Sequence, residues 1–188
     1  MAESLRVSEL IPGFEPQGEL ERDLVRDPTL LAGLAWGSPR AGHPEGSVGA
    51  HVGDLLRRLE EWDEPEPRRS MLRFIALVHD SLKCRVKRWL PKTGENHHAM
   101  RARRFAEGYT DDERLLSTIE LHDRPYAIWR RRLRTGKPQD ERVDAMLARL
   151  PDPGLFLRFV ELDGSTPGKR SEPISWLRDE LRRRGMET

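Results

Sequence analysis

The apolar residues of this chain recur at helical spacing from one end to the other. They return every three or four positions, and no segment alternates apolar and polar residues as a half-buried strand does. Short breaks rich in proline and glycine separate the periodic segments, as is usual between packed helices. The pattern predicts an all-α fold in one compact domain, with an N-terminal arm and short helices over residues 1–42 and a helical core over residues 43–188.

The most apolar segment, residues 71–83, organises the rest of the chain. Its apolar residues cover two adjoining helix faces, so this helix belongs in a core. The segment ends in His79 and Asp80, where an unpaired charge would be costly. A buried carboxylate beside an imidazole is typical of a metal site. The two faces consist of Leu72, Ile75, Ala76 and His79, and of Met71, Phe74 and Val78.

Capping residues mark where several of the other helices begin. Asp27 followed by Pro28 is a typical helix start, and Ser47 is a suitable N-cap for an amphipathic helix up to Trp62. In that helix His51 lies beside the apolar stripe, so its side chain is expected at the core or its rim. An irregular arm is expected over residues 1–16. Further helices are predicted over residues 18–26, 95–109, 111–122, 126–134, 138–150, 153–163 and 173–184.

Composition excludes several classes of protein. The 188 residues are 35% charged but carry a net charge of only +1, so no global charge attracts nucleic acid or membrane. Cys84 is the only cysteine, which excludes a disulfide framework and a cysteine-based zinc site. The N-terminus lacks the apolar centre of a signal peptide, and no run reaches transmembrane length. We expect a cytoplasmic protein with no membrane partner.

The candidate metal ligands form a series along the chain. Five of the six histidines belong to it, and each lies near a helix end or beside an apolar stripe. Asp163 repeats the situation of Asp80, because it follows another largely apolar helix. The series is His51, His79, Asp80, His97 or His98, His122 and Asp163.

The order H…HD…H…H…D resembles the HD superfamily of metal-dependent phosphohydrolases. The resemblance covers roughly residues 42–170 and is closest to the HD domains of bacterial tRNA nucleotidyltransferases. The chain lacks the GYP motif of one HD subgroup, which argues against cyclic-di-GMP as substrate. The matching motifs are His43-Pro44-Glu45-Gly46-Ser47-Val48 with His51, Leu77-Val78-His79-Asp80-Ser81-Leu82-Lys83, Leu121-His122-Asp123-Arg124-Pro125-Tyr126 and Glu161-Leu162-Asp163-Gly164.

The resemblance implies a role for each member of the series. Four residues match the ligands of a first metal: His51, His79, Asp80 and Asp163. His97 and His122 match the histidines of a second metal, with Asp80 bridging the two ions. In the His97-His98 doublet the resemblance favours His97 as the ligand, which leaves His98 for a substrate phosphate.

The ligand types indicate the chemistry. Histidine and carboxylate suit Mn, Fe, Ni, Co or Zn, with Mg as a further candidate, and one or two such ions can activate a water toward a phosphate. Asp80 and Lys83 are the expected catalytic residues. Lys83 is also the strongest candidate for substrate contact. The other candidates are Arg85, Lys87 and Arg88 in a basic loop, and His98 and Arg124 further along the chain.

Other basic and aromatic residues allow two interpretations. One group of arginines suits either a nucleic-acid backbone or a solvated face: Arg124, Arg130, Arg131, Arg132 and Arg134. Trp89 and Tyr126 suit either base stacking or core packing.

Three functions compete. The leading hypothesis is a phosphohydrolase acting on a phosphorylated small molecule, a nucleotide or an RNA end such as a 2′,3′-cyclic phosphate or a 2′-phosphate. The alternatives are an HD-fold mixed-valent di-iron oxygenase, which uses the same ligand order, and a non-catalytic nucleotide- or RNA-binding module. The basic loop favours phosphate chemistry, and the complete ligand series argues against a module without catalysis.

Overall fold

The computed structural model describes residues 5–39, 45–166 and 168–186, and it confirms the predicted all-α fold. Within those residues there is no strand, and the one isolated β-bridge joins Gly37 to Ser47. The helices are α1 (Val7–Leu10), α2 (Gly18–Leu24), α3 (Pro28–Leu34), α4 (Val48–Glu60), α5 (Arg68–Val78), α6 (His98–Ala106), α7 (Glu113–Leu121), α8 (Arg124–Thr135), α9 (Asp140–Leu147), α10 (Pro153–Gly164) and α11 (Glu172–Arg183), with short 3-10 turns at η1 (Lys83–Arg85) and η2 (Gly94–Asn96).

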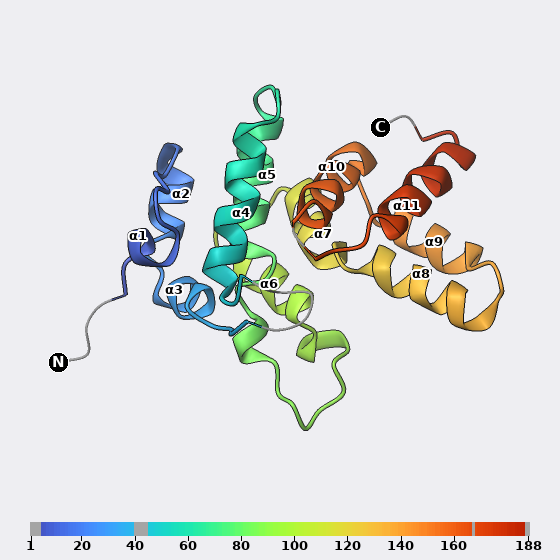
Figure 1. Ribbon diagram of the computed structural model, residues 1–188, viewed down its shortest axis with the longest axis horizontal. Coiled ribbons are helices and arrows are strands. Elements are labelled where there is room, and N and C mark those ends of the chain that lie inside the picture. The colour runs from blue at the N-terminus through green and yellow to red at the C-terminus, as the bar shows by residue number, and fades with distance from the viewer. Residues whose placement is uncertain (1–4, 40–44, 167, 187–188) are drawn as a thin grey trace.

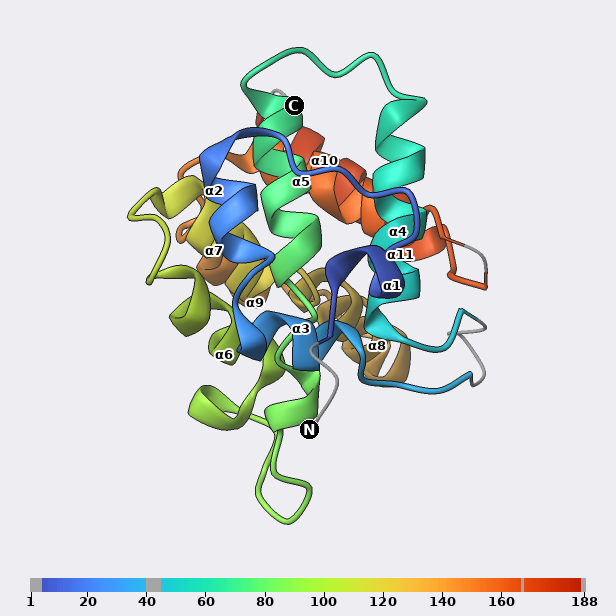
Figure 2. The same ribbon diagram turned by 90° about the vertical axis from the view of Figure 1, so that its left-hand side faces the viewer.

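Helix α5 is the centre of the fold, as its apolar pattern predicts. It packs against α4, α7 and α10. Figure 1 shows α4 beside it, and Figure 2 shows it between α4 and α7. Leu72, Ile75 and Val78 are fully buried, and so is the imidazole of His79 at its C-terminal end. The C-terminal end of α5 therefore lies in the interior, next to His79 and Asp80 of the predicted metal site.

The N-terminal segment belongs to the same core as α5. Ile11, Leu24 and Leu30 are buried with the residues of α4 and α5. The arm predicted to be irregular contains the short helix α1, so that prediction was wrong at residues 7–10. A buried ion pair fixes α2 to α5: Arg73 Nε lies 2.8 Å from Glu21 Oε1, and both side chains are almost fully buried.

The C-terminal helices form a second apolar cluster beside the first. Figure 1 shows α8, α9 and α11 at the end of the molecule opposite α1 and α2. Trp129, Trp176 and Leu177 are buried in this cluster together with Phe156 of α10. Because α10 contributes to both clusters, it connects the α5 core to the C-terminal helices.

Two helices begin at the predicted capping residues, and several other helices begin one to three residues from the predicted start. Asp27 accepts from the Thr29 N–H at 2.6 Å, and Ser47 accepts from the Ala50 N–H at 3.1 Å, as predicted. The helix expected from residue 111 is instead capped by Asp112. The helix expected from residue 95 begins only at His98, because the preceding residue has an extended backbone.

No helix among the described residues is long and apolar enough to cross a lipid bilayer.

Candidate metal centre

A first group of ligand atoms lies where α4, α5 and α10 meet. His51 Nε2 of α4 lies 3.0 Å from Asp163 Oδ1 of α10, and His79 Nε2 lies 3.8 Å from the same oxygen. His79 Nε2 is also 3.5 Å from Asp80 Oδ2. The structure thus brings together all four residues predicted as ligands of a first metal, from α4, α10 and the turn after α5.

Asp80 connects this first group to a second one. Its Oδ2 faces His79, whereas its Oδ1 lies 3.4 Å from His98 Nε2 and 3.6 Å from His122 Nε2. Within each of the sets His51/His79/Asp80 and Asp80/His98/His122, the ligand atoms lie within 4.8 Å of one another. The two oxygens of one buried carboxylate therefore face two separate pairs of histidines.

The placement of the histidine doublet is opposite to the expectation from the sequence. His98 reaches Asp80, whereas His97 Nε2 lies 3.3 Å from Asp123 Oδ2. The reason is the helix boundary: His97 is the N-cap of α6, with φ −82° and ψ 135°, and its Nδ1 accepts from the Ala99 N–H. The side chains of two residues on either side of a helix start point in different directions. A start shifted by one residue would therefore exchange the contacts of His97 and His98.

Hydrogen bonds to the backbone orient two of the histidines. His79 Nδ1 lies 2.9 Å from the Ala76 carbonyl oxygen, and His122 Nδ1 lies 2.8 Å from that of Ile119. A carbonyl can only accept, so each Nδ1 carries a proton and each Nε2 faces the centre with its lone pair available for an ion. Such bonds are the usual means of fixing the tautomer of a metal-binding histidine.

Two buried polar atoms at the centre have no hydrogen bond within the described part of the chain. They are His79 Nε2 and Asp80 Oδ1, and neither exposes surface to solvent. Buried polar atoms are usually satisfied, and an exception requires an explanation such as an ion. Their position and donor type fit a divalent transition metal, which prefers imidazole nitrogen and carboxylate oxygen.

The charges of the centre also suit an ion. Burial lowers the pKa of His79 and brings the pKa of His98 down to about 3, so both rings are neutral. Burial alone would raise the pKa of Asp80, but the neighbouring Lys83 ammonium and His79 hold it well below its usual range. Burial is likewise outweighed at Asp123, where the hydrogen bond to His97 lowers the pKa to about 2. At His122 burial would lower the pKa, but Asp80 and Asp123 outweigh it and raise the pKa. The donor set thus combines neutral imidazoles at His79 and His98 with ionised carboxylates at Asp80 and Asp123.

Two lysines lie at the mouth of the centre. Lys83 Nζ contacts Asp80 Oδ2, and Lys169 Nζ lies 2.6 Å from Asp163 Oδ1. Both lysines line a pocket of about 490 Å³, which we call the central pocket and which also borders His98, His122 and Tyr126. This volume is within the range of small-molecule sites. The centre therefore opens into a space large enough for a ligand, with cations beside its carboxylates.

The predicted substrate contacts divide into two sets. Lys83 and His98 line the central pocket, as expected for substrate contacts. Arg124 instead lines a separate cavity between α8 and α9. Three predicted contacts in the basic loop are exposed and do not line the central pocket: Arg85, Lys87 and Arg88.

Sequence reasoning missed three residues of the centre. Lys169 follows Asp163 in a loop with no periodicity, so only a structure reveals their contact. Asp123 stands in a matching motif but was assigned no role, although its neighbour His122 is itself a candidate ligand. Glu45 Oε1 lies 3.6 Å from His51 Nδ1. The turn in which Glu45 stands was part of the sequence motif, but His43 and Pro44 of that motif lie outside the described residues.

Comparison of the chain with models of protein families, with curated proteins and with solved structures finds no match.

Proposed function

We propose that the protein is a metal-dependent phosphohydrolase of the HD superfamily type, acting on a nucleotide or on an RNA end such as a 2′,3′-cyclic phosphate or a 2′-phosphate. One observation carries this proposal: the carboxylate of Asp80 lies between two pairs of histidines, three of which are buried. The order of these ligands along the chain is the order from which the resemblance was drawn.

The two groups of ligands give the proposed ion sites. The first comprises His51, His79, Asp80 and Asp163, and the second comprises Asp80, His98 and His122. A divalent ion bound there would polarise a phosphate oxygen and lower the pKa of a water molecule. The donor set suits Mn, Fe, Ni, Co or Zn. The second site is expected to be the weaker, because it has fewer protein ligands.

The side chains around these sites would bind and orient the phosphate. Lys83 and Lys169 each hold a carboxylate of the centre and line the central pocket. An ammonium can donate three hydrogen bonds, so each lysine can keep its carboxylate and also donate to a phosphate oxygen. Lys83 and Lys169 would thereby hold the phosphate over Asp80 and Asp163. No nucleophilic side chain is needed, because the activated water would attack the phosphate.

The test is a phosphate-release screen on purified protein supplied with each candidate metal. Mononucleotides, cyclic nucleotides and oligonucleotides with 2′,3′-cyclic or 2′-phosphate ends are the substrates, and Asp80→Asn is the control. The proposal predicts release by the wild type in at least one metal form and none by Asp80→Asn. No release from any substrate would contradict it. Oxygen consumption by the iron form, with no phosphate released, would instead support the oxygenase alternative.

A further inference from the structure

A second pocket adjoins the central pocket along helix α8. We call it the outer pocket, and it shares Tyr126 and Arg170 with the central pocket. Because the two pockets share lining residues, a ligand held at the metal centre can continue into the outer one. The outer pocket is lined by Tyr126, Trp129, Arg130, Leu133, Arg134 and Arg170.

Three of its lining residues form a stripe that leads away from the metal centre. Tyr126, Arg130 and Arg134 are four residues apart, so they lie on one face of α8. At about 1.5 Å of rise per residue the stripe is roughly 12 Å long. It begins three residues after Asp123, which borders the central pocket. A ligand confined to the central pocket would not need a surface of this length.

The arginines of the outer pocket have no carboxylate partner among the described residues. Arg130 lies over the Tyr126 ring, with its guanidinium carbon 5.6 Å from the ring centre, and the side chains of Arg134 and Arg170 make no ion pair within the described ranges. Helix α8 itself contains no acidic residue. These charges are therefore available to an anion.

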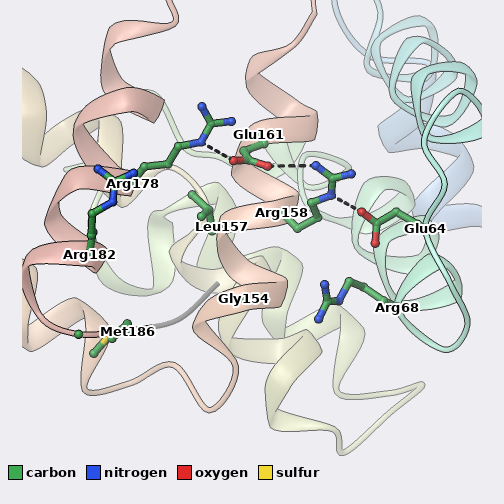
Figure 3. A pocket seen from close by; sticks show the side chains of 10 residues that line it. Glu64, Arg68, Gly154, Leu157, Arg158, Glu161, Arg178, Arg182 and Met186 are labelled. Atoms are coloured by element: carbon green, nitrogen blue, oxygen red, sulfur yellow. Dashed lines mark hydrogen bonds and ion pairs between the residues drawn. The ribbon is translucent and has the colours of Figure 1, made fainter.

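Another cavity rich in arginine contrasts with the outer pocket. It measures about 670 Å³ and lies beside α10 and α11 (Figure 3). There, however, Glu161 lies 3.2 Å from Arg158 and 2.6 Å from Arg178, and Glu64 also contacts Arg158 (Figure 3). Arg158 and Arg178 already hold carboxylates, whereas the arginines of the outer pocket hold none among the described residues.

Aromatic surface accompanies the free charges of the outer pocket. Tyr126 is 47% exposed, and its ring stacks on the buried Trp129 with the ring centres 6.0 Å apart. Trp129 thus supports Tyr126 from within. Because Arg130 lies over the ring, a stacked base would take the place of its guanidinium, which could then bind a phosphate. A supported, exposed ring among unpaired arginines is the arrangement that holds a base by stacking and its phosphates by charge.

We propose that the outer pocket binds single-stranded nucleic acid, with Tyr126 stacking on a base and Arg130, Arg134 and Arg170 holding the phosphates. This inference rests on the proposed phosphohydrolase function, because it makes the oligonucleotide, rather than the mononucleotide, the preferred bearer of the phosphate. The end of the strand lies in the central pocket over Asp80, and the strand continues along α8.

The first test is binding of a fluorescent single-stranded oligonucleotide to the full chain, followed by anisotropy over a range of salt. Arg130→Glu/Arg134→Glu is expected to lose at least about tenfold in affinity, and its salt dependence should fall by roughly 0.7 in slope for each lost phosphate contact. Tyr126→Ala should lose about tenfold and Tyr126→Phe much less, as expected for a stacked base. The matched control is Arg132→Glu, an exposed arginine of the same helix outside both pockets.

Two results would overturn the inference. One is equal binding by the outer-pocket variants and Arg132→Glu. The other is competition by an acidic peptide as effective as that by unlabelled oligonucleotide, which would indicate a protein partner.

Hydrolysis separates this inference from the proposed function. Phosphate release is compared between a mononucleotide and an oligonucleotide with the same terminal ester. A preference for the oligonucleotide that Arg130→Glu/Arg134→Glu reduces about tenfold supports the inference. If both substrates are hydrolysed equally by the wild type and by the variants, the inference is overturned but the proposed phosphohydrolase function is not. Binding that depends on the outer pocket, with no phosphate released from either substrate, supports the binding site and contradicts the phosphohydrolase.

Discussion

His51 and Asp163 meet at 3.0 Å although 112 residues separate them in the chain. Their contact joins α4 to α10 at the C-terminal end of α5, where His79 and Asp80 lie. Lys169 donates to the same oxygen of Asp163 that faces His51. The first group of ligands is therefore assembled by the tertiary fold and cannot exist in any local segment of the chain.

Asp163→Asn should remove one ion and spare the other. Asp163 faces His51 and His79 but has no contact with His98 or His122 in the described structure. Calorimetric titration of manganese into metal-free protein should therefore show at least about tenfold weaker binding at one site, as expected for the loss of a ligand. The control is Asp179→Asn, because Asp179 is exposed and pairs with Arg182. Loss of both ions in Asp163→Asn would contradict the separation of the two sites.

His98→Ala and His97→Ala should differ in the second ion. His98 Nε2 faces Asp80, whereas His97 Nε2 faces Asp123. We expect His98→Ala to abolish the weaker manganese site in the same titration and His97→Ala to retain it. His122→Ala should behave as His98→Ala does, since His122 faces the same oxygen of Asp80. The reverse order of the two doublet variants would restore the assignment favoured by the sequence.

Arg73→Ala should be among the most destabilising substitutions outside the centre. Arg73 donates to both oxygens of Glu21, at 2.8 and 2.9 Å, and to the Glu15 carbonyl oxygen at 3.1 Å. Removing it leaves the Glu21 carboxylate buried without its cation, which costs about 3–5 kcal/mol. Urea unfolding measures the loss.

Arg26→Ala is the control for Arg73→Ala. Arg26 pairs with Asp23 at the surface, with 75% of its side chain exposed. Exposed pairs contribute about 0–1 kcal/mol, so this variant should unfold almost as the wild type does. Equal unfolding free energies for the two variants would mean that the buried pair contributes no more than an exposed one.

Tyr109 should make the stability of the fold depend on alkaline pH. Burial, together with the hydrogen bond that its hydroxyl donates to Asp27, raises its pKa from 10.0 to about 12. Because the folded pKa is the higher one, the stabilisation is complete below pH 10 and disappears as the pH rises toward 12. Tyr109→Phe should cost about 1 kcal/mol at neutral pH and show a smaller loss of unfolding free energy across that alkaline range. Parallel curves for the two proteins would contradict this.

Gly33→Ala should disturb the turn that carries the metal ligands. A Cβ atom at Gly33 would lie 1.9 Å from the backbone oxygen of Ser81, the residue after Asp80. We expect a loss of about 1–3 kcal/mol, as for other overpacked sites, and weaker manganese binding because the turn must move. Gly53→Ala is the matched control, since its Cβ would meet only the Ile11 side chain at 3.4 Å and alanine favours the helix. A Gly33→Ala protein as stable as Gly53→Ala would contradict the close packing of α3 on the turn.

Much of the fold could be predicted because its signals are local. The apolar period identifies the helices, and Asp27 and Ser47 mark two of their starts through hydrogen bonds to residues two or three positions on. The predicted end of α5 in buried His79 and Asp80 follows from the same pattern. The meeting of His51 and Asp163 with these residues was predicted from the order of the ligands, and periodicity alone would not have provided it.

The parts that escaped prediction depend on single residues or on distant packing. The partners of His97 and His98 depend on which of the two begins α6, and helix boundaries are uncertain by at least one residue in any sequence pattern. Lys169 reaches Asp163 from a loop that has no repeating pattern. Arg124 turns away from the centre because it stands at the first position of α8, where its side chain enters the cavity beside α9.

Anomalous scattering from crystals of the manganese-loaded protein tests the central claim most directly, because it locates each ion. The account predicts a strong peak between His51, His79, Asp80 and Asp163, and a weaker one between Asp80, His98 and His122. In Asp80→Asn both peaks should weaken or disappear, since Asp80 borders both groups. Crystals grown at saturating manganese with no peak beside Asp80 would contradict the metal centre and, with it, the proposed phosphohydrolase.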